Sequence, residues 1–399
     1  MATILKIPTN NTKGVLTFTT PERDKIIFPN SSIQDRLRKL KKQWVIGLHH
    51  NWQDHYFKYN DLFDFSLLPN EDMVHTKNQE PFPFIKLQCA NFSPPCFLLN
   101  THPKFWDILH VSRAQKGKGV LDFFKVIRVL YDQGKHYRVL LICPIPPHNP
   151  NRKDFIYNLR DYYNKTFSFA ERERFTLLTT NFRYPYPFDI ETLAHFYHSS
   201  KILMNSGKHE RQGRVNSYAW ACGMPVVALE QMGDQLSKHL RESPILFGAK
   251  KYADFPDLVI EAINYCNQRQ NFDDFREVSN ECSEHHNIHD FKLALTGYCG
   301  GKVEEAENYS LKNLDRRLGR HHGFGDSTNG LPWALEEFLE YIENRPISLI
   351  KQDINHPDPE RNITDLPNFQ KGQSVMSSSS SLFIIAKTKK LIRLIKQRL

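Results

Sequence analysis

Apolar residues between positions 106 and 266 follow two alternating patterns. Short continuous apolar runs predict strands, and stretches with an apolar residue at every third or fourth position predict amphipathic helices. The predicted strands are 106–111, 137–143, 176–179, 201–204 and 225–229. The predicted helices are 120–131, 152–174, 190–198, 215–221 and 255–266. Strands that alternate with helices and lack hairpin turns indicate a parallel sheet with helices on both faces.

The first hundred residues are less regular but contain similar signals. The expected elements are strands at 14–19, 25–28, 44–48 and 63–68 and a charged helix at 33–42. The third of these strands ends in His49-His50. An α/β sheet presents its ligand-binding groups in loops at the carboxyl ends of strands. Both histidines are therefore candidate site residues, with a structural role at the end of a strand as the alternative.

These patterns predict an α/β protein with two Rossmann-like domains, of which the first is reduced. Residues 1–104 would form the first domain and residues 105–300 the second, followed by a helical extension over 301–352. Residues 353–381 contain Pro, Asn, Asp and Ser in the manner of a flexible linker. Residues 382–399 carry lysine and arginine but no acid, and their apolar positions fall at helical spacing. We expect a basic amphipathic helix there.

The composition fits a folded protein of two domains: 399 residues, of which 40% are apolar and 24% are charged. No apolar run approaches the ~20 residues that a membrane-spanning helix needs. The N-terminus lacks the charged-then-apolar order of a secretory signal. The seven cysteines are odd in number and none are spaced Cys-x-x-Cys, which favours reduced thiols. We therefore expect a cytoplasmic protein.

The formal net charge of +9 favours anionic partners. An RNP-like aromatic strand and zinc-finger spacing are both missing, so no specific nucleic acid is expected as a partner. Much of the positive charge lies in residues 382–399. That helix has two interpretations. It lies on an anionic membrane surface, which would make the protein peripheral to the membrane, or it packs back on the protein.

The first segment with chemistry is 111–119, between a predicted strand and a predicted helix. Its glycines let backbone amides approach an anion closely, and the new helix offers its positive end. Arg113 and Lys118 add two full charges, and Gly119 directly precedes the helix. The segment predicts a diphosphate site, and a solvated basic turn is the alternative.

The second segment is 205–218, again between a strand and a helix. The carboxylate of Glu210 can accept hydrogen bonds from sugar hydroxyls. The turn at Gly213 and the helix start at Arg214 and Val215 offer amides to a hydroxyl-rich or phosphate-rich ligand. Alternatively, Glu210 complements the dipole of the helix that follows it.

The third segment, 219–229, combines small helix residues with Gly223, which permits a left-handed helix stop, and a buried strand. The three segments appear in the order Arg-x4-Lys-Gly, Glu-x2-Gly, Ala-x-Ala-Cys-Gly-x-Pro-Val-Val-Ala. This order resembles the retaining glycosyltransferases of family 4. The resemblance covers about half of the chain, 106–299, and its most specific part is 219–228.

The resemblance implies a GT-B fold, in which two Rossmann-like domains face a donor cleft. It implies transfer of a sugar from a nucleotide-sugar donor to a glycan, lipid or protein acceptor, with retention at the anomeric carbon. Arg113, Lys118 and Gly119 would hold the donor diphosphate, and Glu210 would act beside the transferred sugar. Because fixed cations stabilise the leaving group, the family implies no metal and no further cofactor, in keeping with the lack of an obvious Asp-x-Asp.

The same resemblance assigns the remaining candidates. Gly213, Arg214 and Val215 would line the donor site. Tyr218 stands where the family has a second Glu that holds the nucleotide ribose, and a phenol can also bond a ribose hydroxyl. His49 or His50 stands where such enzymes direct a histidine at the donor sugar.

One other function stays open, and one candidate metal site is set aside. Tyr218 and the short first domain favour a catalytically inactive GT-B-like scaffold or glycan-binding protein. Cys282, His285, His286 and His289 have spacings that suit a metal site, but their segment is charged and histidines are frequent in this chain. We expect no metal there.

Overall fold

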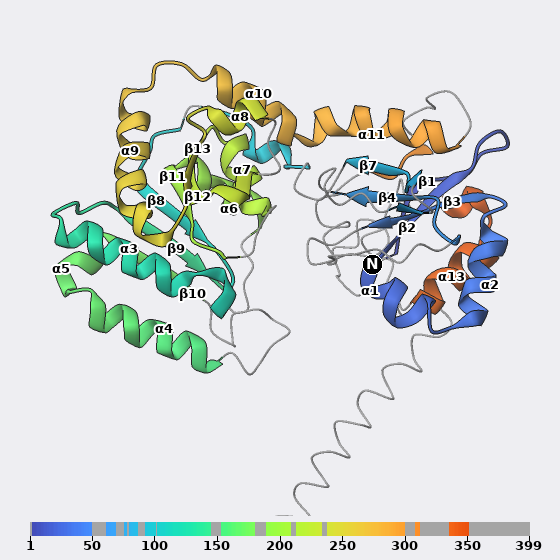
Figure 1. Cartoon of the computed structure of the whole chain (residues 1–399), viewed down its shortest axis with the longest axis horizontal. Helices are drawn as coiled ribbons and strands as arrows, with labels where there is room; N and C mark the ends of the chain where they lie inside the picture. Colours follow the sequence, from blue (N-terminus) through green and yellow to red (C-terminus); the bar gives the residue numbers. More distant parts are fainter. Residues whose placement is uncertain are drawn as a thin grey trace, which may run out of the picture.

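The computed structural model describes residues 2–49, 61–68, 76–77, 80–86, 92–100, 102–144, 153–179, 189–208, 213–233, 238–299, 308–311 and 335–350. These residues form two α/β lobes, each built on its own sheet (Figure 1). The predicted linker 353–381 and basic helix 382–399 lie outside the described residues. Within the described part, no helix has the length and apolar character to cross a bilayer.

The second lobe contains a six-stranded sheet in which every pairing is parallel. In spatial order the strands are β10 (Phe175–Thr179), β9 (Val139–Cys143), β8 (Trp106–Val111), β11 (Ser200–Asn205), β12 (Val226–Leu229) and β13 (Leu246–Ala249). Counted along the chain, this order is 3-2-1-4-5-6, which is the order of a Rossmann fold. The predicted fold class is confirmed for this lobe.

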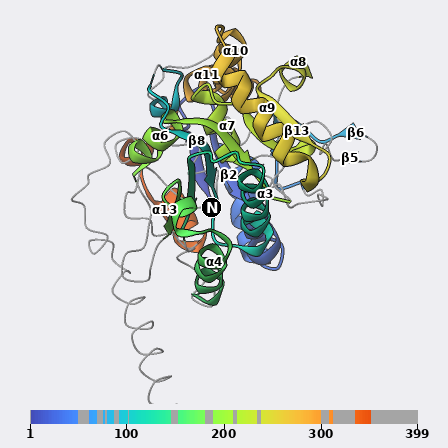
Figure 2. The same cartoon turned by 90° about the vertical axis from the view of Figure 1, so that its left-hand side faces the viewer.

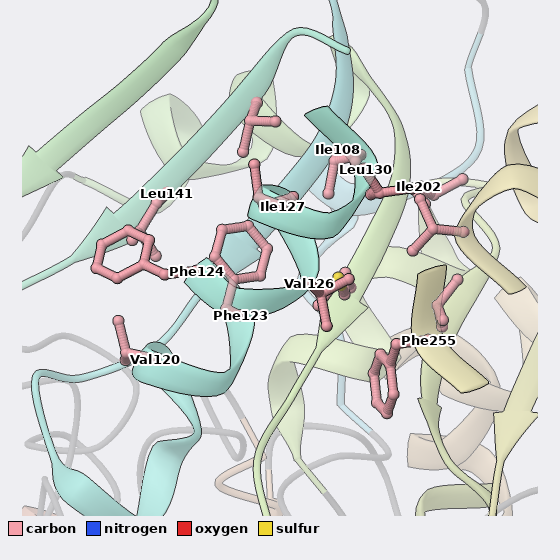
Figure 3. Packing of buried hydrophobic residues seen from close by; sticks show 14 of the residues in the cluster. Ile108, Val120, Phe123, Phe124, Val126, Ile127, Leu130, Leu141, Ile202 and Phe255 are labelled. Carbon is pink, nitrogen blue, oxygen red and sulfur yellow. The ribbon is translucent and has the colours of Figure 1, made fainter. Parts of the chain in front are cut away.

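Helices cover both faces of this sheet. One face carries α3 (Val120–Asp132), α4 (Lys153–Thr166) and α9 (Phe255–Gln268), with α5 (Phe169–Arg172) beside β10; the other carries α6 (Ile190–His198), α7 (Arg214–Ala221), α8 (Lys238–Glu242) and α10 (Asp273–Cys282). Figure 2 shows β8 between α6 on one side and α3 and α9 on the other. Phe123 and Phe124 of α3 pack on Ile108 and Leu141 of the strands (Figure 3). Because both faces are buried, the strands are continuous apolar runs in the sequence.

The first lobe contains a five-stranded sheet. Its strands in spatial order are β1 (Thr3–Lys6), β2 (Gly14–Thr19), β3 (Trp44–His49), β4 (Phe65–Leu68) and β7 (Phe84–Lys86). β1 is antiparallel to β2, and the other pairings are parallel. A separate small hairpin joins β5 (Thr76–Lys77) to β6 (Glu80–Pro81). This lobe is also Rossmann-like, as predicted.

Much of the cover of the first sheet comes from distant parts of the chain. α2 (Ser31–Leu40) shares one face with α13 (Leu335–Asn344), whose Phe338 packs edge-on against Phe18 of β2. The opposite face is covered by α11 (Glu284–Cys299), whose Phe291 and Leu295 belong to the same apolar cluster as Val15 and Phe65. Figure 1 shows α11 lying along this sheet after α10 leaves the second lobe.

This packing departs from the domain boundaries that the sequence predicted. α11 falls within the predicted second domain (105–300), and α13 falls within the predicted helical extension (301–352), yet both pack on the first sheet. The apolar stripe of an amphipathic helix shows that a face is buried but not which sheet buries it. The first lobe is therefore larger than residues 1–104.

The chain crosses between the lobes at two places that lie side by side. Phe92 packs in the first lobe and Phe97 in the second, while Cys282 packs in the second and Phe291 in the first. Backbone hydrogen bonds fasten the crossings together: the Ser93 amide donates to the Cys282 carbonyl (2.8 Å), and the Glu284 amide donates to the Ser93 carbonyl (3.2 Å).

Two local predictions were wrong. The expected strand at 25–28 is helical, because a capping box between Thr19 and Glu22 opens α1 (Thr20–Glu22), which runs on into the π-helical segment η1 (Arg23–Ile27). The expected helix at 152–174 is two helices, since Ser168 caps a new start and forms a capping box with Glu171.

Candidate functional site

The order of strands in the second sheet reverses between β8 and β11, which are neighbours. The loop after β8 leads to α3 on one face, and the loop after β11 leads to α7 on the other. Loops that leave toward opposite faces open a crevice at the carboxyl edge, and ligands of such folds bind there. The structure thus brings the first two predicted segments to one switch point.

The two loops touch each other directly. The Ser206 hydroxyl donates to the Gly119 carbonyl (2.9 Å), and the Lys208 amide donates to the Gly117 carbonyl (3.4 Å). Gly119 has a left-handed φ of 69°, and a Cβ at this position would lie 1.7 Å from the Ser206 carbonyl oxygen. Glycine is needed at 119 for both reasons. Any larger residue would push the two loops apart.

Arg113 and Lys118 carry the positive charge of the first loop. Arg113 is exposed, and Lys118 is half-buried at the end of a 3₁₀ turn, η5 (Lys116–Lys118). Burial and, to a smaller extent, the charge of Arg113 together lower the pKa of Lys118 to about 8. The two cations are close enough to repel one another, so an anion bound between them would relieve an existing electrostatic cost.

The second loop is held by two buried asparagines. The side-chain amide nitrogen of Asn205 donates to Asn216 Oδ1 (2.8 Å), and Asn205 Oδ1 accepts from the backbone amide of Gly207 (3.1 Å). The side-chain amide nitrogen of Asn216 donates to the Met232 sulfur (3.8 Å). These contacts fix the path of the loop and the start of α7. Asn205 ends β11 and Asn216 lies in the first turn of α7, places where asparagine is usually exposed, so nothing in the sequence indicates that this pair is buried.

Both helices at the switch point begin at a glycine. Gly119 precedes α3 and Gly213 precedes α7, and neither helix start has a side-chain cap. A helix start without a capping side chain keeps first-turn amides that can bond other groups, and its dipole favours negative charge. Arg214 and Val215 are half-buried in the first turn of α7, at the place the sequence predicted.

Tyr218 lies in the packed interior of the second lobe. Its side chain is 6% exposed, and its ring stacks on Phe97 (4.1 Å between centroids, 14° between planes). Tyr197 adds an edge contact at 6.2 Å. The sequence prediction placed Tyr218 against the nucleotide ribose. The ring packs α7 against the segment that enters the lobe. The contact of the Tyr218 hydroxyl with a nucleotide ribose stays a prediction.

The other predicted residues fall at the edges of the described part. His49 ends β3 and is buried, between Thr19 of β2 and Leu67 of β4. His50 and Glu210 lie outside the described residues, so the sequence predictions for both stay predictions.

Lys208 is a third cation at this edge, in addition to the two predicted from the sequence. Its Nζ lies 3.6 Å from Asp122 Oδ2 in the first turn of α3 and 5.4 Å from the centre of the Tyr252 ring. The Tyr252 hydroxyl in turn donates to the Ser206 carbonyl (3.0 Å). Its place next to Gly207, directly after a strand, was the signal available in the sequence.

The Cys-His cluster at 282–289 is divided by the fold. Cys282 is 6% exposed in the core of the second lobe, within hydrogen-bond reach of Ser217, while His285, His286 and His289 are exposed on α11. Among the described residues, no group of three or more His, Cys, Asp or Glu side chains is arranged to hold a metal ion. The six cysteines of the described part are free thiols.

No protein-family model and no curated protein matches this sequence. Solved structures of GT-B glycosyltransferases are similar to the chain. One is the C-terminal domain of a glycosyl transferase group 1 family protein, LpcC, from Francisella tularensis (14% identity, 48% of this chain and 87% of that chain, TM-score 0.32).

Two more are an alpha,alpha-trehalose-phosphate synthase (UDP-forming) from Burkholderia vietnamiensis (10% identity, 67% of each chain, TM-score 0.44) and TarM (12% identity, 71% of this chain and 53% of that chain, TM-score 0.45). This chain therefore spans about half of the TarM structure.

Proposed function

We propose that this chain is a glycosyltransferase that moves a sugar from a nucleotide-sugar donor to a glycan, lipid or protein acceptor. The observation that carries the proposal is the pair of cations, Arg113 and Lys118, held at a Rossmann switch point beside a second loop that begins a helix at Gly213. A crevice with two fixed positive charges and two helix starts suits a pyrophosphate.

The charge arrangement also suits the chemistry of transfer. As the bond between the anomeric carbon and the diphosphate oxygen breaks, negative charge develops on the leaving nucleoside diphosphate. Arg113 and Lys118 would stabilise that charge without a metal ion, because both cations belong to the loop that opens the crevice. In this proposal Glu210 contacts the transferred sugar, His49 or His50 lies across from it, and the anomeric configuration is retained.

Binding of nucleoside diphosphates tests the proposal. Titration calorimetry with UDP, GDP and ADP should show that Arg113→Ala and Lys118→Ala each weaken binding about tenfold or more, since each removes a charge-assisted contact. Arg138→Ala is the matched control, because Arg138 lies at the opposite edge of the same sheet, over the Phe105 ring. Equal affinity of the wild type and the Arg113/Lys118 double variant would contradict the proposal.

A catalytically inactive scaffold is the second candidate, and the burial of Tyr218 favours it. Tyr218 stands where the resembling family has its second Glu, and its ring packs in the core of the lobe. Turnover separates the two candidates. A transferase hydrolyses or transfers at least one of a panel of UDP-, GDP- and ADP-sugars, and Glu210→Ala abolishes that turnover without unfolding the protein. A scaffold binds but leaves every donor intact.

The location of the acceptor is proposed from the C-terminal residues of the chain. The basic helix predicted at 382–399 would hold the enzyme at an anionic membrane surface, which suits a lipid-linked acceptor. Sedimentation with phosphatidylserine vesicles, with and without residues 382–399, tests this part independently of donor binding.

A further inference from the structure

β8 and β11 separate at a defined point along their length. Their backbone pairing runs from Ser200 opposite Trp106 to Leu203 opposite Leu109. On its other side, β8 stays paired with β9 as far as Val111 opposite Ile142. The next residues of the separating strands are His110 and Met204. The split between β8 and β11 therefore begins at His110, where the switch-point crevice opens.

The His110 ring bridges this split. It is 1% exposed and stacks on Phe123 of α3 (4.6 Å, 28°). Its Nδ1 lies 2.6 Å from the Met204 carbonyl oxygen, and its Nε2 lies 3.0 Å from the Ser112 hydroxyl. A carbonyl can only accept, so Nδ1 carries the hydrogen. In the neutral ring Nε2 is then an acceptor, and the Ser112 hydroxyl donates to it.

These two bonds join the bases of the two site loops. Ser112 is the first residue after β8, and its amide also donates to the Ile142 carbonyl (3.0 Å). Met204 directly precedes Asn205, whose side chain orders the loop after β11. One imidazole therefore links the loop that carries Arg113 and Lys118 to the loop that leads to Glu210.

We propose that His110 is a positioning residue for the diphosphate site, which as neutral Nδ1–H imidazole holds the two loops at a fixed separation. This inference takes the diphosphate ligand from the proposed function. The two hydrogen bonds of His110 do not depend on that function. Electrostatics support the neutral form. Burial and, to a smaller extent, the charge of Lys118 lower the pKa of His110 to about 4, against the opposing effect of the Met204 hydrogen bond. The ring is thus neutral across the physiological pH range, and the Met204 carbonyl selects its Nδ1–H tautomer.

Three variants test the role. His110→Phe keeps a ring on Phe123 but removes both hydrogen bonds, and Ser112→Ala removes one. His110→Asn keeps an amide donor near the Nδ1 position, so it should restore part of what His110→Phe loses. His195→Phe is the control, because His195 is an exposed histidine on α6.

Two readouts separate this inference from the proposed function. In the wild type, nitrogen-15 NMR of the ring should show the Nδ1–H tautomer. Hydrogen exchange should be about tenfold faster in His110→Phe for amides of both loops, 112–119 and 206–208, but unchanged in 139–143. UDP affinity should fall about tenfold with unchanged stoichiometry, with Ser112→Ala and His110→Asn intermediate.

An Nε2–H tautomer, or unchanged exchange in both loops, would overturn the inference whether or not UDP binds. Wild-type protein that shows the expected tautomer and loop exchange but binds no nucleoside diphosphate would instead overturn the proposed function. If His110→Phe does not fold, Ser112→Ala decides: it leaves the ring in place and must still loosen loop 112–119.

Discussion

The two sheets of this protein differ in the order of their strands. In the first lobe, the described strands follow one another across the sheet in chain order, β1-β2-β3-β4-β7, whereas in the second lobe the order reverses between β8 and β11. A reversal sends neighbouring loops to opposite faces and opens a crevice between them. The second sheet therefore opens the crevice in which we propose the diphosphate site, and the described part of the first sheet contains no such reversal.

The lobes also differ in how they are assembled. The core of the second lobe comes from one stretch of chain, 97–282. The first lobe needs α11 and α13 from the far end of the sequence, and residues 308–311 extend its edge through a hydrogen bond from the Ser310 amide to the Leu5 carbonyl (3.0 Å). The comparison indicates that the second lobe can fold from local sequence, while the first depends on the whole chain.

Expressing the two lobes as separate fragments should give the largest difference in stability between them. A fragment of residues 92–282 should unfold cooperatively, whereas a fragment of residues 1–100 should not, because it lacks the helices that bury both faces of its sheet. Urea titrations followed by circular dichroism check both fragments against the full chain. A cooperative transition for 1–100 would show that α11 and α13 are not needed.

A single substitution in α11 should destabilise one lobe selectively. Phe291 is 1% exposed on the first sheet, so Phe291→Ala should reduce the free energy of unfolding of that lobe by about 3–5 kcal/mol. Leu293→Ala is the control on the same helix, because Leu293 is 48% exposed. This substitution should change the free energy of unfolding by about 0.5 kcal/mol or less. Hydrogen exchange of β2 and β3 measures the effect, with β9 and β12 as the internal reference.

The pH dependence of binding should show the smallest effect, and it is specific to the second lobe. Lys118 has a pKa lowered to about 8 in the free protein, so its charge is present below that pH and is lost above it. Affinity for UDP should therefore be constant near pH 7 and fall by up to about tenfold per unit above pH 8.

A bound diphosphate favours the charged amine, so binding near pH 8 should take up protons. Calorimetry in buffers of different ionisation enthalpy measures this uptake. Lys118→Arg should bind without it, because arginine keeps its proton throughout this range. Proton uptake that persists in Lys118→Arg would assign the effect to another group.

The sequence predicted the second lobe far better than the first. The boundaries of β8 and α6 agree with the prediction, and those of α3 and β12 agree within one residue. Each of these elements is long or strongly apolar for its type, so its periodicity is clear. The strand predicted at 25–28 failed because the capping box of Thr19 and Glu22 outweighs the local preference of the apolar run for a strand.

The sequence indicated the charged residues of the candidate site but not the residues that hold its loops in place. Arg113, Lys118 and Gly119 could be selected because their side chains or lack of one imply chemistry without reference to a partner. Asn216 and His110 could not, because their roles come from buried contacts that only the fold creates. The position of Lys208 after Gly207 could be read from the sequence, but its contact with Asp122 could not. The resemblance placed Tyr218 at the ligand, and only the structure shows that its ring also stacks on Phe97 in the core.

The sequence by itself determined the α/β class, the elements of the second lobe and the two segments that meet at the switch point, because periodicity and glycine placement are local properties. The tertiary structure decided which sheet α11 and α13 cover, where β8 and β11 separate, and that one buried imidazole spans the gap. Those outcomes depend on which apolar faces find each other across the chain, and a linear pattern does not encode that choice.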